Sequence, residues 1–133
     1  MLGKTQTSST RRRSSRSAVV RRGELWWGSP RLPGGSGKRR PFLIVSDDAF
    51  NTNDRYPKVM VVHLTTVRRG GGPFAWEVEL PGGTAGLPRT STIKCGEVYT
   101  LLKNHLSQLV GTLPTEAMHR VDRALAVALS LRM

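Results

Sequence analysis

The period at which apolar residues recur changes once along this 133-residue chain, and this change constrains the fold most strongly. From residue 115 onward, Met118, Val121, Leu125 and Leu129 recur at the spacing of one helix face. Before that point the apolar runs are only as long as strands, and turns rich in Gly and Pro separate them. Strands first and a helix last predict a mainly β (α+β) domain, a small curved antiparallel sheet closed by a C-terminal helix.

Two apolar runs are expected at the centre of the sheet. Residues 42–46 form an apolar run that ends at Ser46, and residues 59–65 are rich in β-branched side chains. Residues 75–80 alternate with period two, as in a strand with one buried face. Further strands are expected at 25–27, 91–94, 97–101 and 109–112, a mobile loop at 30–41, a helical turn or loop at 47–53, and a final helix that begins at Thr115.

The net charge of +12 is distributed unevenly. Residues 1–22 hold seven basic residues and no acid, whereas residues 23–133 hold 14 basic and nine acidic residues, so their net charges are +7 and +5. We expect residues 1–20 to be a disordered basic tail and residues 21–133 to be a single domain. The tail has three open interpretations: an arm that attracts RNA, extra residues ahead of a true start near Val19 or Val20, or a transit peptide. The remaining +5 favours a polyanionic partner.

Composition argues against several classes of site. No apolar run approaches the ~20 residues of a membrane-spanning helix, so we expect a cytoplasmic protein that does not enter a membrane. Cys95 is the only cysteine, which rules out an internal disulfide and a Cys-rich zinc site. The Gly-rich segment before Lys38 lacks the spacing of a phosphate-binding Walker loop. Asp47, Asp48 and Asp54 are interpreted as a solvated turn, and we expect neither a metal nor a cofactor.

Short motifs follow one another in a fixed order over residues 21–131. They are Arg22-Gly23-Glu24-Leu25-Trp26-Trp27, Arg39-Arg40-Pro41 before the run 42–51, His63-Leu64-Thr65-Thr66, Gly86-Leu87-Pro88-Arg89-Thr90-Ser91, Thr100-Leu101 with Lys103, and Val110-Gly111-Thr112-Leu113 before the final helix. In this order the chain resembles the MazF/PemK toxins, which are mRNA interferases of type II toxin–antitoxin systems. The resemblance implies an SH3-like barrel of the CcdB/MazF kind and a bacterial homodimer whose substrate groove crosses the dimer interface.

The resemblance also implies an activity. It indicates a sequence-specific, metal-independent endoribonuclease that cleaves single-stranded RNA to 2',3'-cyclic phosphate and 5'-hydroxyl ends and so inhibits translation and growth. The RNA would be messenger RNA, or else transfer or ribosomal RNA. The implied partner is a small antitoxin with a disordered, acidic and apolar tail. The alternative is a non-catalytic binding protein on the same fold, either a gyrase poison similar to CcdB or an RNA-binding module.

Arg40 and Thr65 are the main candidates for catalysis. Cleavage that uses the 2'-hydroxyl as nucleophile needs a proton acceptor, a donor for the 5'-oxygen and positive charge against the phosphorane. Arg40 precedes a buried strand, and its guanidinium can bind a phosphate at two points. By resemblance, Arg40 matches the family's catalytic Arg and Thr65 matches its catalytic Thr, which holds the scissile phosphate.

His63 is a weaker catalytic candidate that comes from the strand pattern. Residues two apart in a strand face the same side, so His63 should project beside Thr65, where the family usually has no His. Its imidazole could be an auxiliary base or acid, or His63 could be a half-exposed strand residue without a catalytic role. Arg39, Lys38, Thr66, Arg68 and Arg69 are candidates for contacts with RNA phosphates.

Aromatic side chains and departures from the family bear on base recognition. Trp26 and Trp27 point to opposite faces of one strand, and Trp27 is the candidate for base stacking. Tyr99, also a candidate RNA contact, stands where the family often has Arg, and Glu97 where it often has Gln. The segment 34–38 lacks the Glu that family members commonly carry before the Arg-Pro motif, so any assistance from that Glu is absent.

Overall fold

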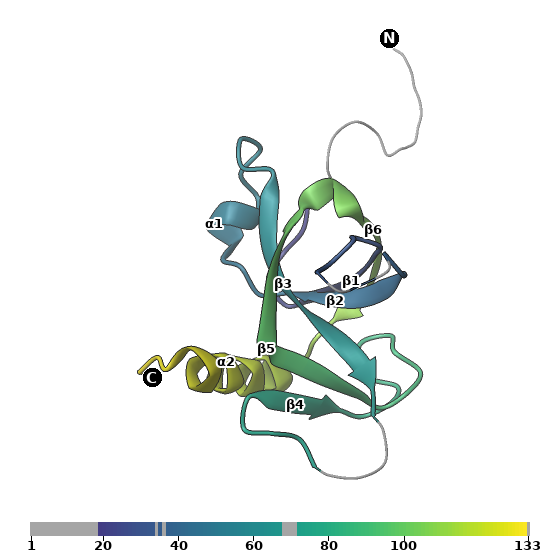
Figure 1. Cartoon of the computed structure of the whole chain (residues 1–133), viewed down its shortest axis with the longest axis vertical. Helices are drawn as coiled ribbons and strands as arrows, with labels where there is room; N and C mark the ends of the chain where they lie inside the picture. The colour runs from purple at the N-terminus through teal and green to yellow at the C-terminus, as the bar shows by residue number, and fades with distance from the viewer. Residues whose placement is uncertain (1–18, 34, 36, 68–71, 133) are drawn as a thin grey trace.

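A computed structural model describes residues 19–33, 35, 37–67 and 72–132 (Figure 1). The predicted disordered tail lies almost wholly outside the described residues, as do Arg68 and Arg69. The strands form one antiparallel sheet in the order β4-β5-β3-β2-β1-β6. The elements are β1 (Glu24–Gly28), β2 (Arg40–Ile44), α1 (Asp48–Asn51), β3 (Lys58–Thr66), β4 (Glu77–Leu80), β5 (Ser91–Leu102), the 3-10 turn η2 (Lys103–His105), β6 (Leu106–Thr112) and α2 (Thr115–Leu129).

The sheet is strongly curved (Figure 1). The long strand β5 lies near one edge of the sheet and β6 forms the other edge, yet only the short turn η2 connects them, so the sheet has to bend round to bring their ends together. The helix α2 then crosses the end of the sheet next to β4 and β5 (Figure 1). This arrangement confirms the predicted curved antiparallel sheet with a C-terminal helix. The two runs predicted at the centre, β2 and β3, are neighbours in the middle of the sheet.

Alternation along the strands produces two apolar clusters on opposite faces of the sheet. One cluster packs beneath α2, and its members include Leu25, Leu43 and Val62. The other fills the concave side, and its members include Trp26 and Phe42. Trp26 is buried and Trp27 only partly buried, which agrees with the prediction that the two indoles face opposite sides.

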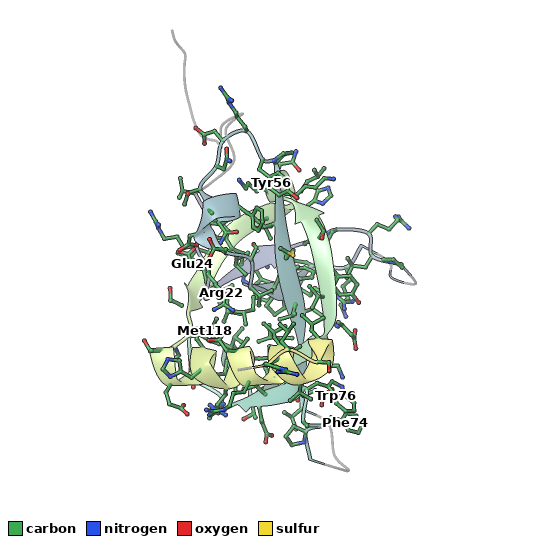
Figure 2. All side chains as sticks on the ribbon, turned by 90° about the vertical axis from the view of Figure 1, so that its left-hand side faces the viewer. Arg22, Glu24, Tyr56, Phe74, Trp76 and Met118 are labelled. Carbon is green, nitrogen blue, oxygen red and sulfur yellow. The ribbon has the colours of Figure 1, made fainter. Side chains whose placement is uncertain are left out.

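The helix α2 is held by its apolar face and by Arg22. It begins at Thr115 directly after Pro114, as predicted, and Val121 is fully buried against the sheet. Arg22 Nε donates to the carbonyl oxygen of Val45 at 2.9 Å, and Arg22 Nη2 donates to Asp122 Oδ1 at 2.8 Å. Figure 2 shows Arg22 between the sheet and α2, near Met118. The Arg of the first motif therefore connects the sheet to the helix.

Some expected boundaries were wrong. The region expected as two strands, at 91–94 and 97–101, is the single strand β5. β4 begins only at Glu77, because Trp76 lies in the preceding turn, where its exposed ring stacks on Phe74 at 4.8 Å (Figure 2).

The prediction that Asp48 belongs to a solvated turn was also wrong. Asp48 is part of the local structure, since its carboxylate accepts a hydrogen bond from the backbone N–H of Arg22 at 2.8 Å.

Candidate active site

Arg40 is placed by the start of β2. Arg40 pairs with Gly28 of β1, and the next residue, Pro41, has no backbone N–H to donate to a neighbouring strand. The next strand residue, Phe42, is fully buried and lies opposite His63 of β3. Since alternate strand residues share a face, Arg40 lies on the same concave side of the sheet as Phe42 and His63. The partly buried guanidinium thus lies at the rim of the concave cluster.

His63 lies between Arg40 and Glu97. Arg40 Nη1 is 3.3 Å from His63 Nδ1, and His63 Nε2 is 2.7 Å from Glu97 Oε1. Only 8% of the His63 side chain is exposed, so this residue is buried rather than half-exposed. The hydrogen bond with His63 is the main cause that lowers the pKa of the Glu97 carboxyl. Glu97 is therefore an ionised carboxylate at neutral pH.

A bulge in β5 brings Glu97 to this position. Val62 pairs with Val98 and Leu64 pairs with Ile93, so β5 advances five residues while β3 advances two. His63 is the β3 residue at the bulge, and continuing the Val62–Val98 register places Glu97 opposite it. The bulge therefore determines which carboxylate meets the imidazole.

Tyr99 completes this side of the site. Its hydroxyl donates to Glu97 Oε1 at 3.3 Å, and its ring meets the His63 ring edge-on at 5.7 Å between centroids. Burial, with the neighbouring carboxylate as a lesser cause, raises the pKa of the Tyr99 hydroxyl. Tyr99 is therefore a neutral hydrogen-bond donor at the wall of the site.

These side chains share a cavity of about 200 Å³. Four predicted site residues line it, namely Lys38, Arg40, His63 and Tyr99, and Glu97 lines it with them. The segment that precedes β2 supplies the opposite wall through Pro30, Leu32, Pro33, Gly35 and Gly37. The cavity therefore combines two cations, an imidazole and a carboxylate.

The other predicted residues that the structure describes do not line this cavity. Thr65 is partly buried and pairs with Thr92 of β5, whereas Thr66 is exposed at the end of β3. The pairing of β2 with β3 ends at Phe42 and His63. Extending the same register by two residues would put Thr65 opposite Arg40. Arg68 and Arg69 belong to the part of the chain that the structure does not describe.

Arg39 and Trp27 form a separate pair beside the cavity. The guanidinium carbon of Arg39 lies 4.4 Å from the centroid of the Trp27 ring, and Arg39 Nη2 donates to Gln108 Oε1 at 3.1 Å. A cation over an aromatic ring is a common way of holding such a side chain at a surface. The two residues predicted for phosphate and base contacts are thus in contact with each other.

Two further features of the surface lie away from these residues. A larger hollow of about 620 Å³ is lined by β4, the turn before it and α2, and none of the predicted site residues that the structure describes lines it. Among the described residues, no three His, Cys, Asp or Glu side chains gather as ligands for a metal ion. No helix in the described ranges is long and apolar enough to cross a membrane.

Glu97 is the member of the site that sequence reasoning did not predict. It was noted only where the family often has Gln, because neither spacing nor composition reveals that β5 slips relative to β3 at this point. One signal was present in the sequence. Gly96 stands alone inside a strand pattern, and an isolated Gly in a strand often marks a bulge.

Comparison with known proteins supports the fold and the family. Residues 21–129 match the family described as PemK-like, MazF-like toxins of type II toxin–antitoxin systems. Endoribonuclease MazF6 of Mycobacterium tuberculosis is 34% identical over 115 residues, which cover 85% of this chain and 99% of the relative. Endoribonuclease EndoA of Bacillus subtilis is 28% identical over 115 residues, which cover 85% of this chain and 97% of the relative.

Solved structures agree with the sequence matches. A mycobacterial endoribonuclease in complex with its cognate antitoxin has a TM-score of 0.67 at 29% identity, covering 86% of this chain and 98% of that one. MazF from Deinococcus radiodurans has a TM-score of 0.66 at 21% identity, covering 86% and 99%, and this likeness supports the fold alone. The fold and the resemblance predicted from the sequence are confirmed, and the chain belongs to the PemK-like, MazF-like toxins of type II toxin–antitoxin systems.

Proposed function

We propose that this toxin is a metal-independent endoribonuclease that cleaves single-stranded RNA at a short sequence, leaving 2',3'-cyclic phosphate and 5'-hydroxyl ends. The observation that carries the proposal is the convergence of Lys38, Arg40 and His63 on one cavity. In this reaction the 2'-oxygen attacks the adjacent phosphorus and the bond to the 5'-oxygen breaks. The substrate therefore supplies its own nucleophile, and the protein must supply charge, orientation and proton transfer.

Arg40 is the residue proposed to stabilise the phosphorane. Its guanidinium carries several N–H donors, and among the described residues only Nη1 faces a side-chain partner, His63, so other donors can serve phosphate oxygens. Thr65 is proposed to hold the scissile phosphate through its hydroxyl; its position two residues beyond His63, the last β3 residue paired with β2, supports this role. Lys38 adds positive charge at the rim, which strengthens RNA binding more than it accelerates the chemical step.

His63 is proposed to transfer a proton during the reaction. It is the only imidazole that lines the cavity, and one of its ring nitrogens already faces the Arg40 guanidinium. Imidazole is the side chain best suited to proton transfer near neutral pH. The remaining candidates, Arg39, Thr66, Trp27 and Tyr99, are proposed as contacts for neighbouring phosphates and bases, together with Arg68 and Arg69.

Two partners follow from the same proposal. The toxin is proposed to act as a homodimer and to bind a cognate antitoxin whose acidic, apolar tail is attracted by the basic site. The mycobacterial endoribonuclease described above has been solved in complex with its cognate antitoxin. Light scattering of the purified toxin tests the dimer, and a monomer at micromolar concentration would contradict it.

Cleavage assays in EDTA test the catalytic assignment. Arg40→Ala and Thr65→Ala should each lose most of the cleavage while RNA binding falls only modestly, because both residues mainly serve the transition state. Arg55→Ala is the matched control, since Arg55 is exposed in the segment between α1 and β3. If both site variants cleave at the wild-type rate, the assignment of Arg40 and Thr65 is wrong. If the wild type itself leaves RNA intact, a gyrase-poisoning assay becomes the next test of function.

A further inference from the structure

The partners of His63 determine which of its nitrogens carries the proton. A guanidinium only donates hydrogen bonds, so Nδ1, 3.3 Å from Arg40 Nη1, has to be the accepting nitrogen. The Glu97 carboxylate only accepts, so Nε2 carries the hydrogen of the 2.7 Å bond to Oε1. Both contacts therefore select the same neutral tautomer, with a bare Nδ1 on the side of Arg40.

The backbone around the β5 bulge determines where Glu97 lies. The β5 bulge ends at Glu97, and the adjoining Gly96 lies directly under the indole of Trp76. A Cβ at position 96 would lie 2.7 Å from Trp76 Cδ1, which is closer than side-chain carbons approach each other. Lys94, near the other end of the bulge, forms a salt bridge with Glu77 of β4, with 2.9 Å between Lys94 Nζ and Glu77 Oε2. The carboxylate is thus presented to His63 from a braced segment.

We propose that Glu97 is a positioning residue that holds His63 with Nδ1 as the proton acceptor for the RNA 2'-hydroxyl. This proposal rests on the function proposed above. When the scissile phosphate binds the Arg40 guanidinium, the contact between Arg40 Nη1 and His63 Nδ1 is replaced, and Nδ1 can accept a hydrogen bond from the 2'-hydroxyl. The proton passes to Nδ1, the 2'-oxygen–phosphorus bond forms, and the 5'-oxygen leaves and takes a proton from water. The imidazolium that results is compensated by the Glu97 carboxylate.

Charged and titratable groups from each neighbouring element act on His63. Arg40 of β2 and Lys38 of the preceding segment bring positive charge to the cavity around the His63 ring, whereas Glu97 of β5 brings negative charge. Tyr99 contributes a neutral hydroxyl to the same carboxylate oxygen, and Lys94 partly offsets the charge of Glu97. Glu97 is the only acid among the residues that line the cavity, so its neutralisation should have a distinct signature.

Glu97→Gln tests this role with little change in shape. The amide oxygen can still accept from Nε2–H, but the charge that compensates an imidazolium is gone. We expect kcat to fall about 10- to 100-fold with KM nearly unchanged. We also expect the acidic limb of the pH–rate profile to move to lower pH, because the variant binds the inhibitory proton on His63 less tightly. Glu79→Gln, the same change at an exposed position of β4, should retain the wild-type rate and profile.

A nitrogen-15 NMR spectrum of the imidazoles tests the tautomer without any activity. His63 should show a bare Nδ1 and a protonated Nε2, whereas the exposed His105 and His119 should average between forms. Glu97→Ala should abolish the difference. A protonated Nδ1 in the wild type, or a Glu97→Gln profile that coincides with the wild-type profile, would overturn the proposal. A wild type that leaves RNA intact would instead refute the proposed function itself, whatever the tautomer.

Discussion

Gly96→Ala should weaken both the fold and the site through a single contact. The added Cβ would lie 2.7 Å from Cδ1 and 3.3 Å from Nε1 of Trp76, against an ordinary separation of roughly 3.5–4 Å. The indole must therefore move by about 1 Å or the bulge must shift. Overpacking of this kind costs about 1–3 kcal/mol, and we expect the lower half of that range because Trp76 is 41% exposed and can swing outward.

The assay is a double-mutant cycle on thermal unfolding. A loss of 1–2 kcal/mol lowers Tm by roughly 3–10 °C in a domain of this size. Trp76→Ala removes the obstructing ring, so adding Gly96→Ala to it should cost at most a few tenths of a kcal/mol. If Gly96→Ala is equally destabilising with and without Trp76, the contact is not the cause and the account of the braced bulge is wrong. Phe74→Ala is the control, because it alters the neighbouring stacked ring and leaves Trp76 over Gly96.

Three further predictions follow. Lys103→Met should lower stability by about 1–3 kcal/mol in chemical denaturation, because the buried ammonium donates to two backbone carbonyls at 2.9 Å that would lose their partner; unchanged stability would refute this. Burial raises the pKa of the Cys95 thiol to about 12, so a thiol reagent at pH 8 should label only unfolded protein; rapid labelling of the native state would contradict it. The pKa of Glu97 is lower in the folded protein than its ordinary value of 4.5, so ionised Glu97 contributes stability above pH 4.5, and this contribution is lost as the pH falls through the folded-state pKa. The difference in unfolding free energy between wild type and Glu97→Gln should therefore shrink as the pH falls below 4.5. A difference that grows over this range would contradict the prediction.

Local sequence patterns predicted the elements whose character is set by their own residues. The 3.6-residue period placed α2 correctly at Thr115, and the apolar runs identified β2 and β3 as the central strands. The patterns failed where contacts between strands decide the outcome. A break was expected between Lys94 and Glu97, yet pairing with β3 on both sides of the bulge keeps β5 as one strand. Trp76 continued an alternating pattern, but its ring packs over Gly96 outside β4.

The candidate site was predictable to the extent that single residues indicate their chemistry. Arg40 was singled out by its match to the family's catalytic Arg and by the ability of a guanidinium to bind a phosphate, and His63 by the strand alternation that puts it on the same face as Thr65. Arg40 and His63 lie 3.3 Å apart. Glu97 could not be placed, because its proximity to His63 depends on a register shift. Asp48 was misinterpreted for a related reason, since its hydrogen bond to Arg22 joins segments 26 residues apart in sequence.

The most direct test of the central claim is an analysis of RNA ends after digestion in EDTA. Purified toxin is incubated with a long single-stranded RNA, and the termini on both sides of each cut are identified by mass spectrometry, with Arg40→Ala in parallel. The account predicts discrete cuts with 2',3'-cyclic phosphate and 5'-hydroxyl ends that disappear in the variant. Cuts with 5'-phosphate ends, or cleavage that persists in Arg40→Ala, would contradict an attack by the 2'-hydroxyl at this site.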